Sequence, residues 1–522
     1  MNEFSILFGG KAGDGIDRAS LVVAKLFKRL GYFIYVYREY PSLIRGGHTF
    51  SIVRASKDKI FAHFDEVDVV LAMNQETADL HSGRMKPGAV LAFDPDMIAG
   101  IIKEEDAPPV TANSVMIGIM AKTLGIDWVI VEEVFRAEMT KAVDKNLAVA
   151  RRGYDQAETK LAMRDLKRTV PPVATGNEAM GLGLVKGGLD AYFAYPMTPM
   201  STLLHFLAGH ADEFSLKVIH PESEIGVILM ALGASYTGQR VAIGTSGGGF
   251  CLMTEGYSLA GMAELPIVVA LGQRPGPSTG LPTYSSQSEL HFAMNAGQGE
   301  FARPVIAPGD PEECYYWAQV ALDVAEKYRT PVILLTDKNL GEGAFSFDEA
   351  GAGTVKMAAP TIRDAAKVFK VNGYEHDENG ITTEDSDVTI RMQDKRLAKI
   401  PAIAKEFTKY RQVGVSGDAK AKNAVLCWGS NKGVVTEAAV PLGLRIIQPI
   451  VMSPFPVEEY RKTLAGVAKI VAVENNATGQ LVSLINRYGF DVDANIRKYD
   501  GRAFSVGELR GELEKVVKGW TK

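Results

Sequence analysis

The sequence predicts an α/β protein with three domains. Short apolar runs that suit strands alternate with amphipathic or small-residue segments that suit helices, and this alternation is typical of doubly wound, mainly parallel sheets. A length of 522 residues exceeds what one hydrophobic core serves. The pattern breaks twice, at the segment TVPPVATG and in the long polar stretch 346–420. We therefore expect domains at 1–170, 175–345 and 421–522, with 346–420 as a linker.

Composition and charge argue against several classes of function. The net charge is −5 and no Lys/Arg-rich block or basic tail occurs, so a nucleic-acid partner is not expected. No apolar run is long enough to span a bilayer, and the first residues lack the pattern of a secretion signal. We expect a cytoplasmic protein without a membrane partner.

The three cysteines, Cys251, Cys314 and Cys427, are isolated in the sequence and are expected to be small buried side chains. An iron–sulfur cluster of the ferredoxin kind needs four thiolates. This chain therefore cannot hold one by itself, and no metal site is predicted in it.

The first domain opens with a strand, EFSILFG, followed by a glycine turn and an amphipathic helix from Ile16 to Leu30. Such a turn directs backbone N–H groups at a helix N-terminus, which suits an anion. The glycine spacing does not match a dinucleotide fingerprint. The turn is thus a tight α/β connection, a contact for part of a bound cofactor such as coenzyme A, or, as the poorest match, a nicotinamide or flavin site.

Two further strands, Tyr32 to Tyr37 and Thr49 to Arg54, flank a loop with the sequence YPSLIRGGH. The loop carries Arg45 and His48 beside paired glycines, which permit unusual backbone angles. Because a guanidinium offers a planar fork of donors, this loop is able to grip a carboxylate. The alternative is a solvated loop with its charges in water.

In the second domain, three loops follow predicted strands, so they meet at the edge where parallel sheets bind ligands. The first, YPMTP, holds Thr198 between two prolines; the second is TSGGG; the third, GQRPGPSTG, carries Arg274. Separately, Glu222 and Glu224 open an almost entirely apolar helix. Carboxylates commonly complement a helix N-terminus, but one carried by so apolar a helix is expected to be buried, which favours its protonated form.

YPMTP, the HPESE turn, TSGGG and GQRPGPSTGLPTYSSQSEL resemble, in order and spacing, the α subunit of 2-oxoacid:ferredoxin oxidoreductases. The N-terminal third resembles the γ part of the same family. The resemblance implies three domains in order: a Rossmann-like γ domain, a domain binding the pyrimidine of thiamine diphosphate, and a transketolase C-terminal-like domain with a structural role.

The resemblance also implies roles for residues. Glu224, with Glu222 as the alternative, matches the glutamate that hydrogen-bonds N1′ of the cofactor's aminopyrimidine; Tyr195, Pro196 and Thr198 match other cofactor contacts. Thr198 and Arg274 match residues that hold the substrate's 1-carboxylate. Arg45 and His48 match the segment near the substrate's distal end, and they suit a dicarboxylate.

Finally, the resemblance implies partners. The diphosphate and Mg²⁺ motif, GDG followed by Asn, is not found here, since the first Asn after Gly13–Gly15 is Asn74. A β subunit is expected to supply that motif together with a [4Fe-4S] cluster, in an (αβ)₂ assembly. The expected reaction is coenzyme A-dependent oxidation of 2-oxoglutarate to succinyl-CoA with ferredoxin as acceptor, in either direction, including the carboxylating direction of a reductive TCA cycle. Pyruvate or branched-chain 2-oxo acids, a non-catalytic assembly subunit and a nicotinamide or flavin dehydrogenase are the alternatives.

Overall fold

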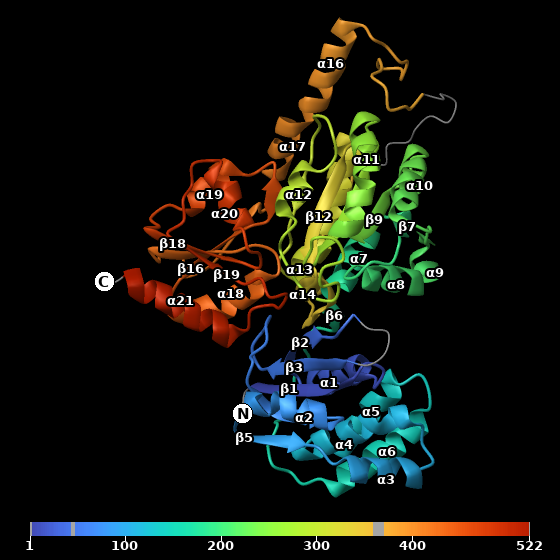
Figure 1. The fold of residues 1–522 in the computed structure, drawn as a ribbon, viewed down its shortest axis with the longest axis vertical. Helices are drawn as coiled ribbons and strands as arrows, with labels where there is room; N and C mark the ends of the chain where they lie inside the picture. Colours follow the sequence, from blue (N-terminus) through green and yellow to red (C-terminus); the bar gives the residue numbers. More distant parts are fainter. Residues whose placement is uncertain (1–2, 43–46, 359–369, 521–522) are drawn as a thin grey trace. The chain divides into compact units, whose positions relative to one another are not determined.

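The structure is a computed structural model that describes residues 3–42, 47–358 and 370–520. The chain divides into two compact units. Unit 1 comprises residues 1–174, 343–348 and 505–508, and unit 2 comprises residues 175–342, 349–504 and 509–522. Three β-sheets with flanking helices confirm the predicted α/β class (Figure 1).

The sheet of unit 1 is mixed, so the prediction of a mainly parallel sheet was wrong there. Strands β2 and β3 follow one another in the chain and pair antiparallel, and β3 also pairs antiparallel with β1. Only the pairs of β4 with β1 and with β5 are parallel within the long strands. In sheet order the strands are β5 (Met85–Ala92), β4 (Val67–Ala72), β1 (Glu3–Lys11), β3 (His48–Ser56), β2 (Phe33–Glu39), β13 (Ala344–Ser346) and β6 (Val173–Thr175).

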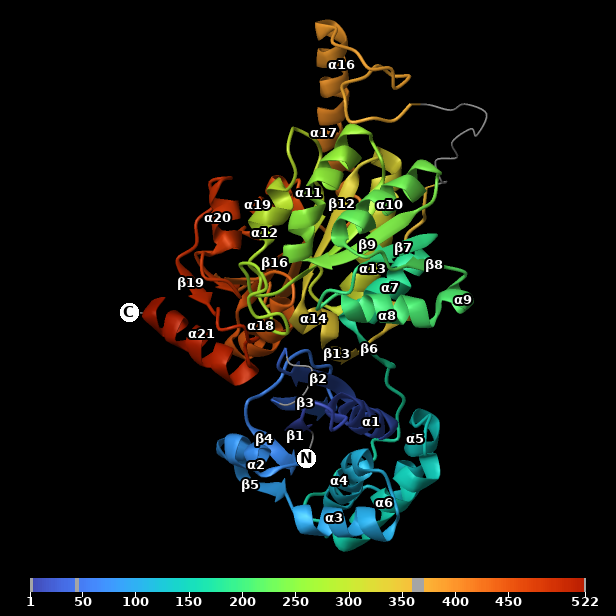
Figure 2. The same cartoon turned by 45° about the vertical axis from the view of Figure 1, so that its right-hand side comes forward.

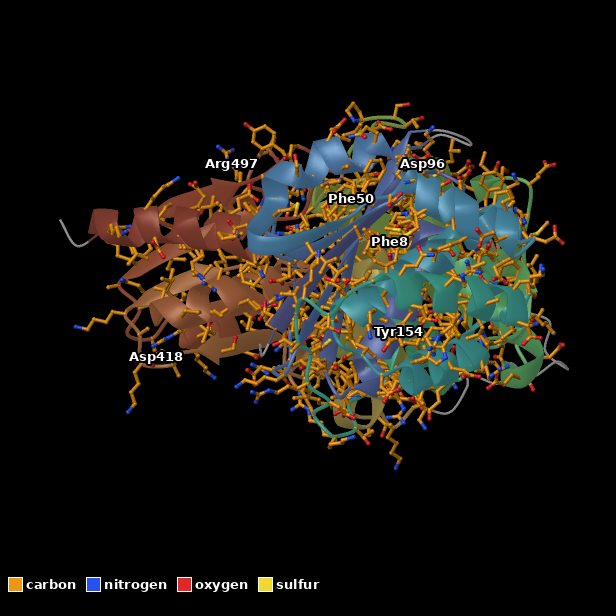
Figure 3. The ribbon with its side chains drawn as sticks, turned by 90° about the horizontal axis from the view of Figure 1, so that it is seen from below. Phe8, Phe50, Asp96, Tyr154, Asp418 and Arg497 are labelled. Atoms are coloured by element: carbon orange, nitrogen blue, oxygen red, sulfur yellow. The ribbon has the colours of Figure 1, made fainter. Side chains whose placement is uncertain are left out.

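Helices of unit 1 share one hydrophobic core with this sheet. The phenyl ring of Phe8 is fully buried in that core, whereas Asp96 lies exposed at the rim of the unit (Figure 3). The helices are α1 (Ile16–Arg29), α2 (Gln75–His81), α3 (Pro95–Glu104), α4 (Ala112–Thr123), α5 (Trp128–Glu138) and α6 (Val143–Gln156), with two short 3₁₀ turns at Ser82–Arg84 and Pro109–Thr111.

The larger sheet of unit 2 is parallel except at one edge, where β17 joins antiparallel. Its inner strands are buried along their whole length, as expected for a sheet covered on both faces. In sheet order the strands are β17 (Val451–Ser453), β11 (Val305–Ile306), β12 (Pro331–Asp337), β10 (Ile267–Gln273), β9 (Val241–Ser246), β7 (Ala191–Ala194) and β8 (Lys217–Ile219).

Helices α10 (Glu224–Tyr236) and α11 (Gly247–Met262) pack with one face of this sheet in a continuous core. Helices α7 (Gly176–Lys186) and α13 (Pro311–Tyr328) pack against each other, and a Cβ added at Gly183 would lie 2.2 Å from the carbonyl oxygen of Tyr315. Glycine at position 183 therefore permits the close approach of these two helices. The remaining helices before the linker are α8 (Ser201–Gly209), α9 (Ala211–Phe214), α12 (Leu290–Asn295) and α14 (Lys338–Glu342).

The stretch 346–420, predicted as a linker, contains regular structure. Helices α15 (Glu349–Ala352), α16 (Ser386–Leu397) and α17 (Lys399–Phe407) lie in it, and α16 extends away from the rest of unit 2 (Figure 2). Helices α16 and α17 are tied to the body of the unit by Glu264, which pairs with Lys395 and Lys399 at 2.6 Å each. The first strand of the third sheet, β14 (Val413–Gly417), also begins before residue 421.

The third sheet is mixed, in the order β14, β16 (Arg445–Pro449), β15 (Asn423–Leu426), β18 (Lys469–Glu474) and β19 (Ala494–Arg497). Its helices are α18 (Asn431–Ala439), α19 (Val457–Thr463), α20 (Gln480–Asn486) and α21 (Val506–Trp520), with a 3₁₀ turn at Val440–Leu442. In the described parts of the chain, no helix is long and apolar enough to cross a membrane.

Candidate active site

The three predicted loops of the second domain do meet at one edge of the large sheet. Strands β7, β9 and β10 are parallel neighbours, so their carboxyl ends lie together. YPMTP follows β7, the glycine triplet follows β9, and Arg274 follows β10. One detail differs from expectation: Gly247–Gly249 form the first turn of α11 and are not a loop.

Arg274 and Thr198 are in direct contact. The guanidinium Nη1 of Arg274 donates a hydrogen bond to the carbonyl oxygen of Thr198 at 3.0 Å. Arg274 is 9% exposed, and burial lowers the pKa of its guanidinium, an effect that the negative charges of Glu289 and Glu224 oppose. A buried guanidinium of this kind is stabilised by binding an anionic group.

Glu224 is the first residue of α10, directly after the cap Ser223. It is 4% exposed, and its Oε1 is buried without a hydrogen-bond partner among the described residues. A buried polar atom without a partner is costly in a folded protein. Its position therefore indicates a ligand that completes the hydrogen bond. Glu222, the alternative, is exposed before the helix begins.

The glycine triplet lets two carboxyl groups approach α11. A Cβ at Gly249 would lie 2.2 Å from Thr245 Oγ1 and 2.9 Å from Glu224 Oε1, and one at Gly247 would lie 1.5 Å from Glu289 Oε1. Between them, Gly248 faces nearly open space, with one atom at 3.6 Å. Glycine is thus required sterically at the first and third positions of the triplet.

Glu289 is a site residue that the sequence reasoning missed. It lies just before α12, and its Oε2 is enclosed without a hydrogen-bond partner in the part of the chain that the structure describes. Burial raises the pKa of its carboxyl group to about 8, and the positive charge of Arg274 opposes the rise. Glu289 lies in SSQSEL, at the end of one of the motifs that resemble the family; the signal for it is a carboxylate that follows the Arg274 loop in the sequence.

The other predicted residues are placed as follows. Tyr195 and Pro196 are exposed at the end of β7, and the Tyr195 ring meets that of His220 edge-on. His48 belongs to unit 1, where its Nε2 lies 2.7 Å from Nε2 of His81. Arg45 lies outside the described residues.

In the histidine pair of unit 1, His81 is buried and His48 is half-buried. Burial lowers the pKa of both rings, that of His81 to about 4, and the Arg84 charge adds to the effect. Both imidazoles are therefore neutral at pH 7, and one ring donates to the other.

Of the three cysteines, Cys314 and Cys427 are buried as predicted, but Cys251 is exposed on α11. In the described ranges, no three His, Cys, Asp or Glu side chains are grouped so as to hold a metal ion.

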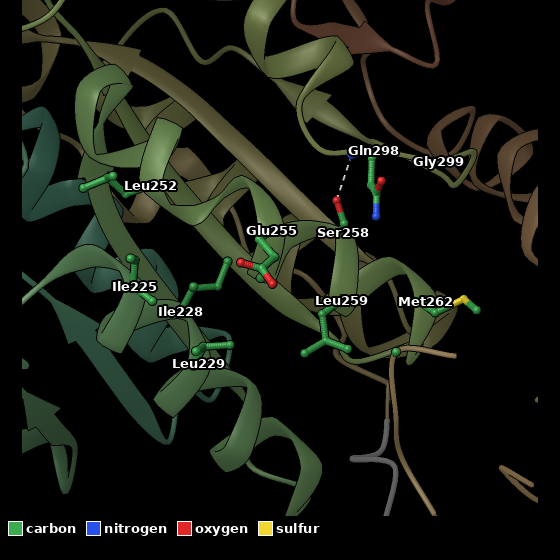
Figure 4. Close-up of a pocket in the computed structure, with 12 residues that line it drawn as sticks. Ile225, Ile228, Leu229, Leu252, Glu255, Ser258, Leu259, Met262, Gln298 and Gly299 are labelled. Carbon is green, nitrogen blue, oxygen red and sulfur yellow. Dashed lines mark hydrogen bonds between the residues drawn. The ribbon is translucent and has the colours of Figure 1, made fainter. Parts of the chain in front are cut away.

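An apolar hollow of about 560 Å³ lies along α10 and α11, and its lining includes Ile225, the residue after Glu224 (Figure 4). Its wall includes Ile225, Leu229 and Leu252, which are 51%, 48% and 52% exposed. At its far end, Ser258 Oγ accepts a hydrogen bond from the backbone N–H of Gln298. Neighbouring exposed apolar side chains of this size are typical of interaction surfaces.

Comparison with known proteins finds relatives of this chain. Residues 183–348 match the family model described as pyruvate flavodoxin/ferredoxin oxidoreductase, thiamine diP-bdg, and residues 5–156 match pyruvate ferredoxin/flavodoxin oxidoreductase. The 2-oxoacid:ferredoxin oxidoreductase subunit alpha of Sulfolobus sp is 30% identical, over 99% of this chain and 98% of that protein. The 2-oxoglutarate oxidoreductase subunit KorA of Mycobacterium tuberculosis is 27% identical, over 97% and 90%.

Among solved structures, 2-oxoglutarate:ferredoxin oxidoreductase from Magnetococcus marinus, with 2-oxoglutarate, coenzyme A and succinyl-CoA bound, superposes with a TM-score of 0.86 at 27% identity. The match covers 99% of both chains. The chain therefore belongs, as an α subunit, to the 2-oxoacid:ferredoxin oxidoreductase family.

Proposed function

We propose that this α subunit takes part in coenzyme A-dependent oxidation of 2-oxoglutarate to succinyl-CoA and CO₂, with two electrons passing to ferredoxin. The observation that carries the proposal is that a buried Glu224 carboxyl group, whose Oε1 has no hydrogen-bond partner among the described residues, converges with Arg274 and Thr198 at one sheet edge. A proton-holding carboxyl group and a carboxylate-binding cation are what decarboxylation of a 2-oxo acid requires of a protein.

The residues present fit the pyrimidine half of thiamine diphosphate. Glu224 Oε1 lacks a hydrogen-bond partner among the described residues, and the absence of a side chain at Gly249 allows the Glu224 carboxyl group to lie against α11. When bound, the cofactor supplies the carbon nucleophile and the electron sink of the reaction. In this proposal Glu224 holds a proton at N1′ of the aminopyrimidine, and Tyr195, Pro196 and Thr198 line the same edge.

Substrate binding is assigned to Arg274 and Thr198 for the 1-carboxylate. A charge-assisted bond from a largely buried guanidinium is about twice as strong as a neutral hydrogen bond. The distal carboxylate is assigned to the segment of Arg45 and His48. The bound 2-oxoglutarate and coenzyme A named for the Magnetococcus marinus enzyme support this choice over pyruvate or branched-chain acids.

The site is completed by a β subunit, as the α-subunit names of the relatives imply. That subunit is expected to bind the diphosphate, Mg²⁺ and a [4Fe-4S] cluster, and to form an (αβ)₂ assembly with this chain. The apolar hollow along α10 and α11 supports a partner at this position, since it adjoins the helix that begins with Glu224.

Purification of the natural complex tests the proposal. We expect a second chain to co-purify, and the complex to reduce ferredoxin when 2-oxoglutarate and coenzyme A are both present. Glu224→Ala should abolish this activity. Unchanged activity would instead favour a non-catalytic assembly subunit, and nicotinamide or flavin absorbance in the isolated chain would favour a dehydrogenase. For specificity, Arg45→Leu should impair 2-oxoglutarate far more than pyruvate; equal losses would remove the argument for a dicarboxylate.

A further inference from the structure

In unit 1, the side chains of His48 and His81 are joined by a direct hydrogen bond. Nε2 of one ring lies 2.7 Å from Nε2 of the other, and the ring centroids are 4.9 Å apart. The two residues come from different elements, since His48 opens β3 and His81 closes α2, 33 residues later. The contact thus joins the residue assigned to the substrate's distal carboxylate to a side chain that the proposed function leaves without a role.

A glycine of β1 lets α2 approach β3 closely enough for this contact. In the sheet, Gly9 of β1 lies opposite Phe50 of β3. A Cβ added at Gly9 would lie 2.6 Å from Thr77 Cγ2 of α2 and 3.3 Å from His48 Cε1, so a larger residue would displace the helix or the His48 ring. The helix is also fixed at its start, where Asn74 Oδ1 accepts hydrogen bonds from the backbone N–H and the hydroxyl group of Thr77, each at 2.8 Å.

Aromatic packing fixes the orientation of both rings. His81 is 4% exposed, and its ring centroid lies 4.6 Å from that of Phe50, which is also 4% exposed. The Phe50 ring also stacks with the ring of His48, with 5.6 Å between the centroids and 22° between the planes. The guanidinium of Arg84 lies 5.5 Å from the centre of the Phe50 ring. Close packing of this kind leaves the imidazole of His81 little freedom to turn.

The contact between the two Nε2 atoms decides where each neutral ring carries its proton. A neutral imidazole has one N–H and one bare nitrogen, so one Nε2 is protonated and the other is bare. If His81 donates, His48 holds its own proton on Nδ1; if His48 donates, its Nδ1 is bare and only accepts. The Nδ1 atoms of both rings are buried without a hydrogen-bond partner among the described residues. Nδ1 of His48 is therefore the nitrogen that remains for a ligand.

We propose that His81 is a positioning residue for His48, and that it thereby favours 2-oxo acids that carry a second carboxylate. The inference rests on the role proposed for His48 at the distal end of the substrate. A carboxylate accepts hydrogen bonds and donates none, so neutral His48 binds it only as the tautomer with a proton on Nδ1. A hydrogen bond donated by His81 Nε2 to His48 Nε2 selects that tautomer and fixes the ring. His81 itself does not touch the substrate.

Steady-state kinetics of the whole complex with two acids test this. His81→Phe keeps an aromatic ring and removes the hydrogen bond. It should raise KM for 2-oxoglutarate at least about tenfold, the factor expected when a hydrogen bond to a charged group is weakened, with a smaller change in kcat. Pyruvate has no distal carboxylate, so its inhibition constant, measured by competition against 2-oxoglutarate, should stay within about twofold of the wild-type value. A general structural defect would instead weaken the binding of both acids.

Rescue by a conservative variant separates positioning from a structural role. The side-chain amide of glutamine reaches about as far as Nε2 of histidine and is also able to donate. His81→Gln should therefore recover most of the affinity for 2-oxoglutarate that His81→Phe loses. Leu80→Gln, on the same helix and 56% exposed, is the matched control and should leave both constants unchanged. Should His81→Phe fail to fold, His81→Leu takes its place with the same expected result.

The outcomes separate this inference from the proposed function. A wild-type complex that does not oxidise 2-oxoglutarate, or a His48→Ala complex with an unchanged KM for it, overturns the role proposed for His48 and the inference with it. If His48→Ala raises that KM while folded His81→Phe leaves it unchanged, or weakens pyruvate equally, only the role of His81 is overturned. Circular dichroism and thermal unfolding establish that each variant is folded before its kinetics are compared.

Discussion

Gly249→Ala offers a sharp test of the site geometry, because the added atom has known neighbours. The new Cβ would lie 2.2 Å from Thr245 Oγ1, 2.8 Å from Glu224 Cγ and 2.9 Å from Glu224 Oε1. Contacts below 3.0 Å essentially never occur for real Cβ atoms. To move from 2.2 to at least 3.0 Å, Thr245 or the start of α11 must therefore shift by about 0.8 Å, and the Glu224 side chain must yield as well.

The expected change in the stability of Gly249→Ala follows from two effects of opposite sign. Overpacking a buried site costs typically about 1–3 kcal/mol of stability, whereas glycine to alanine in a helix gains up to about 1 kcal/mol. The net loss of stability should thus be about 0–3 kcal/mol. A displacement close to 1 Å of a catalytic group costs on the order of 100-fold in rate. Activity should consequently fall much more than stability.

Gly248→Ala is the matched control, since its Cβ meets a single atom at 3.6 Å on the same helical turn. It shares the change in helix propensity without the collision. We expect it to keep wild-type activity and to be equally or more stable. Ferredoxin reduction by the complex and urea unfolding of the α subunit measure the two quantities. If both alanine variants lose activity equally, or if Gly249→Ala is fully active, the packing of Glu224 against α11 is refuted.

Three further predictions concern charge and the apolar surface. Although burial opposes this, two lysines, Lys399 of α17 and Lys395 of α16, lower the pKa of Glu264 to about 2. The stability that Glu264 contributes is therefore present above pH 4.5 and is lost as the pH falls towards 2. In Glu264→Gln, the free energy of unfolding measured in urea should change less with pH across that window. Burial, together with the charges of Arg84 and His48, lowers the pKa of His81 to about 4. The free energy of unfolding should therefore fall as the pH drops from 6.5 to 4. His81→Phe should remove that fall, and a fall that persists in the variant would contradict the assignment to His81. Leu229→Lys, on the apolar hollow, should prevent co-purification of the partner chain. Val440→Lys, in the 3₁₀ turn Val440–Leu442 and similarly exposed at 48%, should not. Equal recovery of the partner with both variants would place the interface elsewhere.

The acid sensitivity of Glu264 also bears on the predicted linker. Its two ion pairs connect a residue just after α11 to α16 and α17, more than a hundred residues later in the chain. A charge pattern in a polar stretch does not reveal its partner, because the pairing depends on where the chain returns. The sequence suggested a linker whose end, KRLAKIPAIAKEFTKY, is helical; the structure has α17 there and α16 before it, and the contact of both helices with Glu264 was not predicted.

The sequence by itself determined the fold class, the order of the three sheet regions and the residues at the ends of β7, β9 and β10. These features are local: apolar runs, proline brackets and glycine turns act within a few residues of themselves. The resemblance of four motifs to one family is likewise visible in the amino-acid sequence alone. Hence Glu224, Thr198 and Arg274 could be named as candidates without coordinates.

Only the tertiary structure decided which side chains contact one another and which strands pair. It showed that Arg274 bonds the Thr198 backbone, that Glu224 lies on Gly249, and that Glu289 fills the space beside Gly247. It also showed that β3 lies between β1 and β2 in an antiparallel arrangement. The physical reason is that burial, contact and pairing depend on residues distant in the chain, and the free energy of such contacts has no signature in the local sequence.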